Sequence, residues 1–311
     1  MAGTVHLPDT GFHEGELAVQ RRAGVAAAAS RLSGMLAPAH LTGGAARFLA
    51  DRTFAALTAR DRDGRLWTSP LTGPPGFLSP AGPTVLDVHA APVAGDPLHA
   101  LEAGQQVGLL VIEFAARRRV RVNGTLTGAR DGALRVEVEQ AYGNCPQYIQ
   151  RRTLAPVPDG GEGGAEPVRH GSALTAPDLE LVRRADTFLV GTTYPGRGSD
   201  ASHRGGAPGF VRADGAGLWW PDYQGNNMFN TLGNLAVDPA AALLFMDFPT
   251  GRTLHLSGSA AVQWTAPGTA GDDDATGRRV RFTPQALVAG RLLAVRGDRV
   301  DAAPDNPALT G

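Results

Sequence analysis

The sequence predicts a mainly β protein that contains two copies of one small antiparallel barrel, with helices at its periphery. The first observation is composition, since 41 glycines and 23 prolines in 311 residues are typical of many short strands joined by turns. The second is an internal repeat, and the third is the alternation of polar and apolar side chains in several segments. A chain of this length also exceeds the size at which one hydrophobic core stops growing, so two domains are expected.

The repeat comprises four pairs of matching segments that occur in the same order. They are Thr53-Phe54 with Thr187-Phe188, Gly73 to Phe77 with Gly206 to Phe210, Gly108 to Phe114 with Ala242 to Phe248, and Arg118 to Gly124 with Arg252 to Gly258. Three pairs are offset by 134 residues and the glycine-phenylalanine pair by 133. The repeat therefore indicates a tandem duplication of one domain.

Residues 1–40 are expected to form a helical arm. The alanine-rich segment from Phe12 to Leu36 is the helix candidate. The simpler interpretation is an arm that packs on the first barrel. The alternative is a lid over a site, in which His13 and Glu14 would form a proton-transfer pair.

The first barrel is expected at residues 41–158 and begins with a short helix from Gly43 to Ala50. Its strands are expected at Thr53–Arg60, Leu66–Leu71, Thr84–His89, Val107–Phe114, Arg119–Gly128 and Leu134–Ala141. The largely apolar run Leu109–Phe114 predicts a central strand. The alternation from Arg119 to Val122 predicts a strand with one wet and one buried face.

A glycine-rich linker is expected at residues 159–171, which places the domain boundary near residue 160. The second barrel follows at residues 172–311. Its helix is expected from Ala176 to Ala185, because acidic residues lie in its first turn and Arg183 and Arg184 in its last, an arrangement that complements the helix dipole.

Composition excludes several classes of function. The formal net charge of −1 gives no global field that attracts nucleic acid or an anionic membrane. All 29 basic residues are arginine, and the absence of lysine excludes a Schiff-base lysine, a pyridoxal phosphate aldimine and a Walker lysine. Cys145 is the single cysteine, which excludes an internal disulfide, a cysteine-rich zinc site and an iron–sulfur cluster. No metal site is expected, since the histidines are scattered.

The chain carries no run of 18 apolar residues, and Met1 to Thr10 shows neither a basic nor an apolar segment of a secretory signal. A cytoplasmic protein without a membrane partner is therefore expected.

The densest polar cluster lies in the second copy and is suited to an anion. Ser202-His203-Arg204-Gly205 combines a hydroxyl, an imidazole and a permanent positive charge with a glycine that allows close backbone approach. Asn226, Asn227, Asn230 and Thr231 supply neutral donors at a predicted strand-to-helix junction. The alternative interpretation is a polar loop in which the asparagines form turns and caps.

The first copy lacks these groups. Ser69-Pro70-Leu71 aligns with Ser202 to Arg204, and Asp96-Pro97 aligns with Asn230-Thr231. A carboxylate repels an anion and a proline has no N–H to donate, so the second copy is expected to build most of the anion site.

Two further candidates come from the basic residues. Arg118 and Arg119 lie in a run of arginines, which is interpreted either as a solvated hairpin turn or as a second contact to the anion. His203 is the acid–base candidate, because Arg204 beside it would lower its pKa if both face the ligand.

Five segments together resemble a known family. They are residues 12–16, 117–124, 144–152, 202–206 and 225–245. The chain resembles the FMN-binding split-barrel superfamily related to pyridoxamine 5′-phosphate oxidase, and in particular its double-barrel branch of flavin-nucleotide-binding proteins. The resemblance implies FMN between the two barrels, with its phosphate held by Ser202-His203-Arg204 and Asn230-Thr231.

The resemblance also implies roles at the flavin ring. Trp67 and Ser69 of the first copy would form the wall that faces the ring, although barrel packing is the simpler interpretation of Trp67. Cys145 would lie near the flavin or substrate, whereas a lone cysteine is most often inert. The oxidase has a basic pair where this chain has Asn230-Thr231, and its substrate-binding arginine and histidine have no counterpart here. Oxidation of pyridoxamine phosphate itself is therefore not expected.

The leading hypothesis is an FMN-dependent oxidoreductase that acts on a small molecule, with NAD(P)H or another electron-transfer partner. The alternative is a non-catalytic protein that binds or senses a flavin, a deazaflavin or haem on the same scaffold. A barrel that only mediates protein contacts is a third possibility, and a homodimer stays open because barrel fusion can replace dimerisation or add to it.

Overall fold

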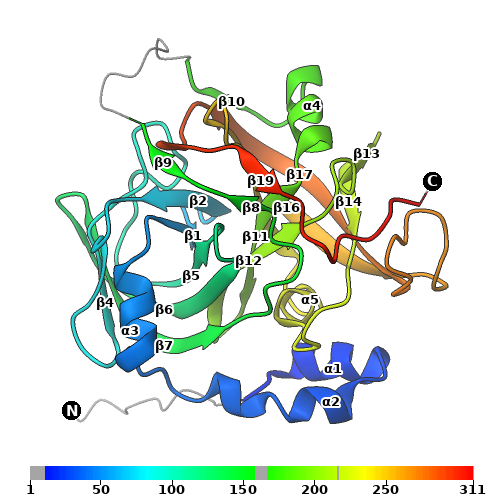
Figure 1. The fold of residues 1–311 in the computed structure, drawn as a ribbon, viewed down its shortest axis with the longest axis horizontal. Helices are drawn as coiled ribbons and strands as arrows, with labels where there is room; N and C mark the ends of the chain where they lie inside the picture. Colours follow the sequence, from blue (N-terminus) through cyan, green and yellow to red (C-terminus); the bar gives the residue numbers. More distant parts are fainter. Residues whose placement is uncertain (1–10, 158–166, 216, 311) are drawn as a thin grey trace.

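The computed structural model describes residues 11–157, 167–215 and 217–310, and contains two large antiparallel sheets, one from each half of the chain (Figure 1). The first sheet consists of β1 (Phe54–Arg60), β2 (Leu66–Thr72), β3 (Leu78–Pro80), β4 (Val85–Val88), β5 (Gln105–Glu113), β6 (Arg118–Arg130) and β7 (Ala133–Gly143). The second consists of β11 (Thr187–Tyr194), β12 (Gly198–Gly205), β13 (Arg212–Asp214), β14 (Gly217–Pro221), β15 (Ala240–Asp247), β16 (Arg252–Trp264) and β17 (Arg278–Gly290), with β10 (Arg169–Gly171) paired to β17.

The two sheets have the same strand order. It is β2-β1-β5-β6-β7-β4-β3 in the first and β12-β11-β15-β16-β17-β14-β13 in the second. Each strand thus has an equivalent ten positions later in the numbering. The predicted fold class, a mainly β protein with peripheral helices and two copies of one antiparallel barrel, is confirmed.

The strand register corrects one of the four sequence matches. Gly73 N donates to the carbonyl of Thr53, and its counterpart Gly206 N donates to the carbonyl of Asp186. This makes Thr53 equivalent to Asp186, so β1 and β11 are offset by 133 residues rather than 134. Phe54 and Phe188 are therefore not equivalent: Phe54 packs between the halves, and Phe188 packs inside the second barrel.

The helices lie outside the sheets. They are α1 (Glu14–Arg22), α2 (Ala26–Ser30), the 3₁₀ helix Ser33–Leu36, α3 (Gly43–Ala50), α4 (Ala176–Arg184) and α5 (Asn230–Leu235). The helix predicted over residues 12–36 is thus three short helices, and Gly24 between the first two has a φ of +72°, which a continuing helix does not allow.

The arm packs on both halves, and not on the first barrel alone as its simpler interpretation expects. Its 3₁₀ helix lies against β7, where Leu36 clusters with Tyr142. α1 lies against α5 (Figure 1), and the contact is so close that a Cβ on Gly15 would clash with the carbonyl oxygen of Gly233. Val19 of α1 belongs to the core of the second barrel.

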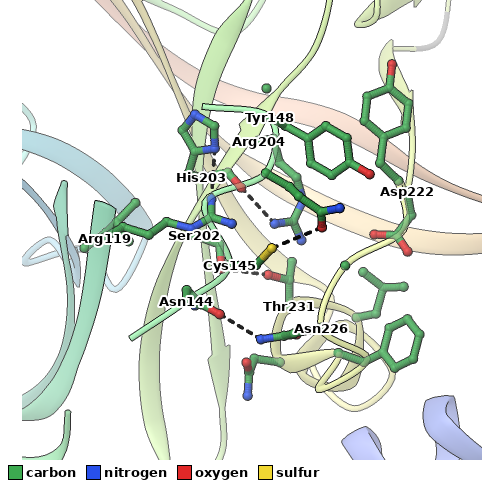
Figure 2. A pocket seen from close by; sticks show the side chains of 18 of the residues that line it. Arg119, Asn144, Cys145, Tyr148, Ser202, His203, Arg204, Asp222, Asn226 and Thr231 are labelled. Carbon is green, nitrogen blue, oxygen red and sulfur yellow. Dashed lines mark hydrogen bonds between the residues drawn. The ribbon is translucent and has the colours of Figure 1, made fainter. Parts of the chain in front are cut away.

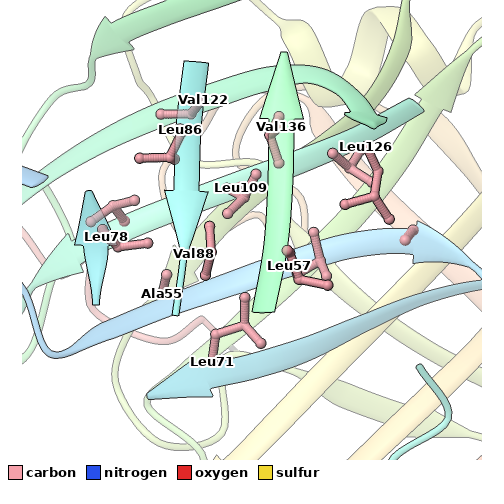
Figure 3. Packing of buried hydrophobic residues seen from close by; sticks show 14 of the residues in the cluster. Ala55, Leu57, Leu71, Leu78, Leu86, Val88, Leu109, Val122, Leu126 and Val136 are labelled. Carbon is pink, nitrogen blue, oxygen red and sulfur yellow. The ribbon is translucent and has the colours of Figure 1, made fainter. Parts of the chain in front are cut away.

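Each barrel has its own apolar core. In the first, alternate residues of the strands point inward, among them Leu57 of β1, Leu109 of β5 and Val136 of β7 (Figure 3). This follows from the two-residue period of a strand. The opposite face of β5 carries Leu110 and is also buried, which explains the largely apolar run in the sequence.

A third apolar cluster joins the halves. It contains Phe54, Leu110 and Phe114 from the first half and Leu244 and Phe248 from the second. β12 lies against β5, and a Cβ on Gly108 would lie only 2.6 Å from the Cα of Asp200. The halves are thus packed as closely as the layers of one core.

Two short ribbons also cross between the halves. β8 (Arg151–Arg152) pairs with β19 (Arg299–Asp301), and β9 (Ala155–Pro156) pairs with β18 (Val295–Arg296). Most of the predicted linker, and the boundary near residue 160, lie outside the described residues. Across the described ranges, no helix is long and apolar enough to cross a lipid bilayer.

Candidate functional site

A pocket lies where the two halves meet, and both halves supply its walls (Figure 2). From the first half come β6 and the segment 144–148 that follows β7. From the second come β12 and the segment 221–232, which leads into α5. The enclosed volume is about 110 Å³.

The two-residue spacing of side chains along β6 and β12 explains why several cationic groups lie in this pocket. Arg119 and Arg121 are two residues apart on β6, so their side chains leave the same face of the strand. Ser202 and Arg204 have the same relation on β12, which lies against β6. Three guanidinium groups therefore line one pocket.

The Arg121 side chain forms hydrogen bonds and an ion pair with the residues around it. Its Nη1 donates to Asn230 Oδ1 at 2.7 Å and to the Tyr142 hydroxyl at 3.0 Å, and its Nη2 donates to Ser202 Oγ. Its Nε lies 2.8 Å from Asp200 Oδ1, and both side chains of this ion pair are 5% exposed. Arg121 thereby connects β6, β12 and α5, and its charge is already balanced.

Arg119 and Arg204, unlike Arg121, have no carboxylate partner among the described residues. Arg119 Nη1 donates to His203 Nδ1 at 3.0 Å, and Arg204 Nη1 donates to the His203 carbonyl at 3.0 Å. Both side chains are half-buried, both Nε atoms are buried without a hydrogen-bond partner, and within the described ranges neither forms an ion pair. Burial, with the nearby guanidinium groups of Arg121 and Arg204, lowers the pKa of Arg119 to about 9, so it stays charged at pH 7. The Asp222 carboxylate also lines the pocket but pairs with Arg278. Two cations that lack an ion-pair partner among the described residues suit the pocket to an anion.

His203 is neutral at pH 7. Burial lowers its pKa well below 6.5, and Arg119 and Arg204 add to this effect. A guanidinium can only donate, so Nδ1 of His203 is the acceptor and the proton sits on Nε2. That buried Nε2 has no partner in the described part of the chain, so it is available to donate a hydrogen bond to a ligand.

Backbone strain is concentrated at the same pocket. Among the described residues, six non-glycine residues have positive φ, and three of them line the pocket: Tyr148 at +64°, Asn227 at +63° and Phe229 at +60°. Asparagine tolerates this region, but an aromatic residue there is unusual and costs free energy. Strained residues that persist in a fold often belong to a functional site.

The two loops that carry these residues are fastened to each other. Asn226 Nδ2 donates to Asn144 Oδ1 at 2.8 Å (Figure 2). The Tyr148 hydroxyl donates to the Gln224 carbonyl at 2.8 Å. The Tyr148 and Tyr223 rings lie 5.1 Å apart. The segments 144–148 and 222–229 thus close one side of the pocket.

The structure brings most of the predicted site residues together. Those that line the pocket are Arg119, Cys145, Ser202, His203, Arg204, Gly205, Asn226, Asn227, Asn230 and Thr231. Thr231 Oγ1 lies 3.1 Å from Ser202 Oγ, which joins the two predicted segments directly. The Cys145 thiol donates to Gln147 Oε1 at 3.1 Å.

Trp67, Ser69 and Arg118 lie elsewhere, which corrects those three assignments. Trp67 is buried in the first barrel and its Nε1 donates to Asp61. Arg118 is exposed and stacks on Phe48, because it alternates with Arg119 and so leaves the other face of β6.

Ser69 is the first-half counterpart of Ser202. The position in the first half that is equivalent to the pocket is filled by buried side chains. There His255 stands where Arg121 stands in the pocket, and Asp96 stands where Asn230 stands. Ser69 Oγ donates to Asp96 Oδ1 at 2.5 Å, and His255 Nε2 lies 3.8 Å from Asp96 Oδ2. The side chains of His255 and Asp96 are fully buried, and burial lowers the pKa of His255 and raises that of Asp96. This position holds no arginine to attract an anion.

In the N-terminal arm, Glu16 contacts the pocket residue Asn230, whereas the predicted pair His13 and Glu14 does not line the pocket. Glu16 Oε1 accepts a hydrogen bond from Asn230 Nδ2, and its Oε2 accepts one from the His13 backbone N–H at 2.9 Å. His13 caps α1 and contacts Asn234, outside the pocket. No pattern in the sequence indicates the contact between Glu16 and Asn230, whereas the two-residue spacing from Arg119 could have identified Arg121.

Glu16 should make stability depend on pH. Burial raises its pKa from 4.5 to about 7. Because the folded state binds this proton more tightly, stability should fall as pH rises from about 4.5 to about 7, by roughly 3 kcal/mol for this group. Urea unfolding of the wild type and Glu16→Gln at pH 5 and pH 8 measures the effect. Burial of His13 acts in the opposite direction, so only the difference between the two proteins is informative. Equal pH slopes would contradict the assignment.

Comparisons with known proteins were made at three levels. No protein-family model and no curated protein matches this chain. Several solved structures resemble part of this chain, covering between 35% and 42% of it. The haem storage protein HutZ from Vibrio cholerae is 13% identical, with a TM-score of 0.30, over 37% of this chain and 94% of its own.

Two further structures have comparable values. A protein from Clostridium acetobutylicum related to general stress protein 26, of the pyridoxine phosphate oxidase family, is 19% identical with a TM-score of 0.28, over 40% of this chain and 92% of its own. An FAD-binding protein from Mycobacterium smegmatis is 13% identical with a TM-score of 0.25, over 40% and 98%. At this level of similarity nothing follows about the ligand of this chain.

Proposed function

We propose that this chain binds FMN in the pocket between its halves and is an FMN-dependent oxidoreductase of a small molecule. One observation carries the proposal: Arg119 and Arg204 line the pocket without an ion-pair partner in the described part of the chain, beside the hydroxyl groups of Ser202 and Thr231. Guanidinium and hydroxyl donors at short range are the groups that recognise a phosphate monoester.

The residues present fit the phosphate end of FMN. Unpartnered Nε atoms on both arginines and an unpartnered Nε2 on His203 are the donors that an anion would satisfy. The enclosed volume of about 110 Å³ is smaller than the ~300 Å³ at the lower end for ligand pockets. The flavin ring is larger than this space, so its binding requires the segments 144–148 and 222–229 to move apart.

Bound FMN would supply one- or two-electron chemistry, and the protein would position it. Arg119 and Arg204 would hold the phosphate, and Arg121 would keep β6, β12 and α5 in place around it. The neutral His203 would donate a hydrogen bond from Nε2. Tyr148 and Tyr223 would exclude water from the mouth of the pocket.

The test is a titration of the purified, ligand-free protein with FMN, in which binding is measured as quenching of FMN fluorescence. We expect one FMN per chain, because the equivalent position in the first half is closed. Riboflavin, which lacks the phosphate, should bind at least tenfold more weakly, since one charge-assisted hydrogen bond contributes about 1.5–3 kcal/mol. No quenching with FMN would refute the proposal.

The oxidoreductase assignment needs a second measurement. Under anaerobic conditions NADH or NADPH should bleach the flavin absorbance of the complex. A bound flavin that no nicotinamide bleaches would support a flavin carrier instead, and a Soret band in the protein as purified would indicate haem.

A further inference from the structure

A second and larger cavity lies on the other side of β8, away from the FMN pocket. Its volume is about 380 Å³, within the range of small-molecule sites. α4, the turn between β15 and β16, and the segment that carries β19 form its walls. The proposed function does not use any of its lining residues.

The lining is amphipathic. Leu181 of α4 and Met246 and Phe248 at the end of β15 form an apolar surface. Arg184 from α4 and Arg252 from β16 stand at its rim, and both are exposed.

Of the three carboxylates at the cavity, Asp186 and Glu180 form ion pairs, whereas Asp247 has only a hydroxyl partner among the described residues. Asp186 forms ion pairs with Arg152 and, at 3.7 Å, with Arg299. Glu180 pairs with Arg183, and Asp247 Oδ2 accepts a hydrogen bond from Thr250 at 2.6 Å. Counting only described residues, Arg184 and Arg252 form no ion pair. Within this part of the chain, two unpaired guanidinium groups therefore lie beside the one unpaired carboxylate of Asp247, and the net unpaired charge of the cavity is positive.

In the first half, side chains fill the position that is equivalent to this cavity. Arg52 there forms an ion pair with Glu113, and the guanidinium groups of Arg52 and Arg118 lie 4.7 and 5.0 Å from the centre of the Phe48 ring. With the strand offsets above, the counterpart of Arg52 is Ala185 and that of Phe48 is Leu181. The second half has lost the two side chains that fill this space and has kept the rim arginine, since Arg252 is the counterpart of Arg118.

We propose that this cavity is a binding site for an organic anion with an apolar body, in which the body packs on Leu181, Met246 and Phe248 and one acidic group pairs with Arg184 and Arg252. The apolar surface accounts for the body and the unpaired rim arginines for the acid. A buried site for inorganic phosphate alone would not need the apolar surface.

Two fluorescent probes of similar shape test the proposal on the full chain. 1-Anilinonaphthalene-8-sulfonate carries a sulfonate, and N-phenyl-1-naphthylamine has the same rings without it. We expect the sulfonate probe to bind at one site per chain and at least tenfold more tightly than the neutral probe. Arg204→Gln, in the FMN pocket, should leave this binding unchanged, so failure of the FMN proposal and failure of this one can be told apart.

Variants locate the probe. Arg184→Glu and Arg252→Glu lie on the surface and should each weaken the sulfonate probe at least tenfold, while the neutral probe changes less than twofold. Ala185→Arg restores the first-half residue and should abolish binding of both probes. Equal affinity for the two probes, or sulfonate binding that survives both glutamate variants, would overturn the proposal.

Discussion

Replacing Arg204 with glutamine should weaken FMN binding by about 10- to 150-fold, and Arg119→Gln should have a similar effect. Each change removes a cation that has no ion-pair partner within the described residues, so the loss is not offset by freeing a carboxylate. Glutamine keeps a donor of similar reach but not the charge. The double variant should lose at least 100-fold.

Riboflavin is the matched control ligand for this experiment. It carries the same ring without the phosphate, so its affinity should change less than threefold in both variants. Arg118→Gln is the matched control variant, because Arg118 is adjacent to Arg119 but exposed and outside the pocket. Equal losses for FMN and riboflavin would show that the arginines maintain the fold of the pocket and do not contact phosphate.

Replacing Arg121 with methionine should have the largest effect on stability. Arg121 and Asp200 form a buried ion pair, and removal of one partner leaves an uncompensated charge that costs about 3–5 kcal/mol of unfolding free energy. Arg121 also donates to Asn230, Tyr142 and Ser202, so their acceptor atoms lose a partner. Urea unfolding measures the change.

Two variants separate the charge from general disturbance of β6. Arg130→Ala, on the same strand but exposed, should change the unfolding free energy by no more than about 0.5 kcal/mol. Arg121→Met combined with Asp200→Asn removes both charges and should recover part of the loss. A double variant no more stable than Arg121→Met alone would mean that lost packing and hydrogen bonds, not the unpaired carboxylate, dominate.

Local residue patterns determined most of the strands. The apolar run at β5 and the alternation at β6 fix which strands are central and which have two kinds of face, because side-chain direction in a strand depends only on position along it. The helices from Gly43 and Ala176 begin where predicted for the same reason. The repeat was visible because both halves bury the same apolar positions.

The exact alignment of the strands of the two halves was harder to predict from the sequence, and the Phe54–Phe188 match shows why. Two similar dipeptides can lie one residue apart in structure, and a shift of one residue turns every side chain to the other face. The hydrogen bonds of Gly73 and Gly206, together with the pairing of β1 with β2 and of β11 with β12, reveal the true offset.

The sequence by itself determined that the chain is a doubled β barrel and that Ser202 to Arg204 and Asn230-Thr231 carry anion-binding groups, because composition, alternation and residue type are local properties. Only the tertiary structure decided that Arg119 joins Arg204 while Arg118 and Trp67 do not, that Glu16 of the arm supports Asn230, and that His255 and Asp96 close the equivalent site. These facts depend on how strands more than 80 residues apart pack across the two halves, and no pattern along the chain encodes that packing.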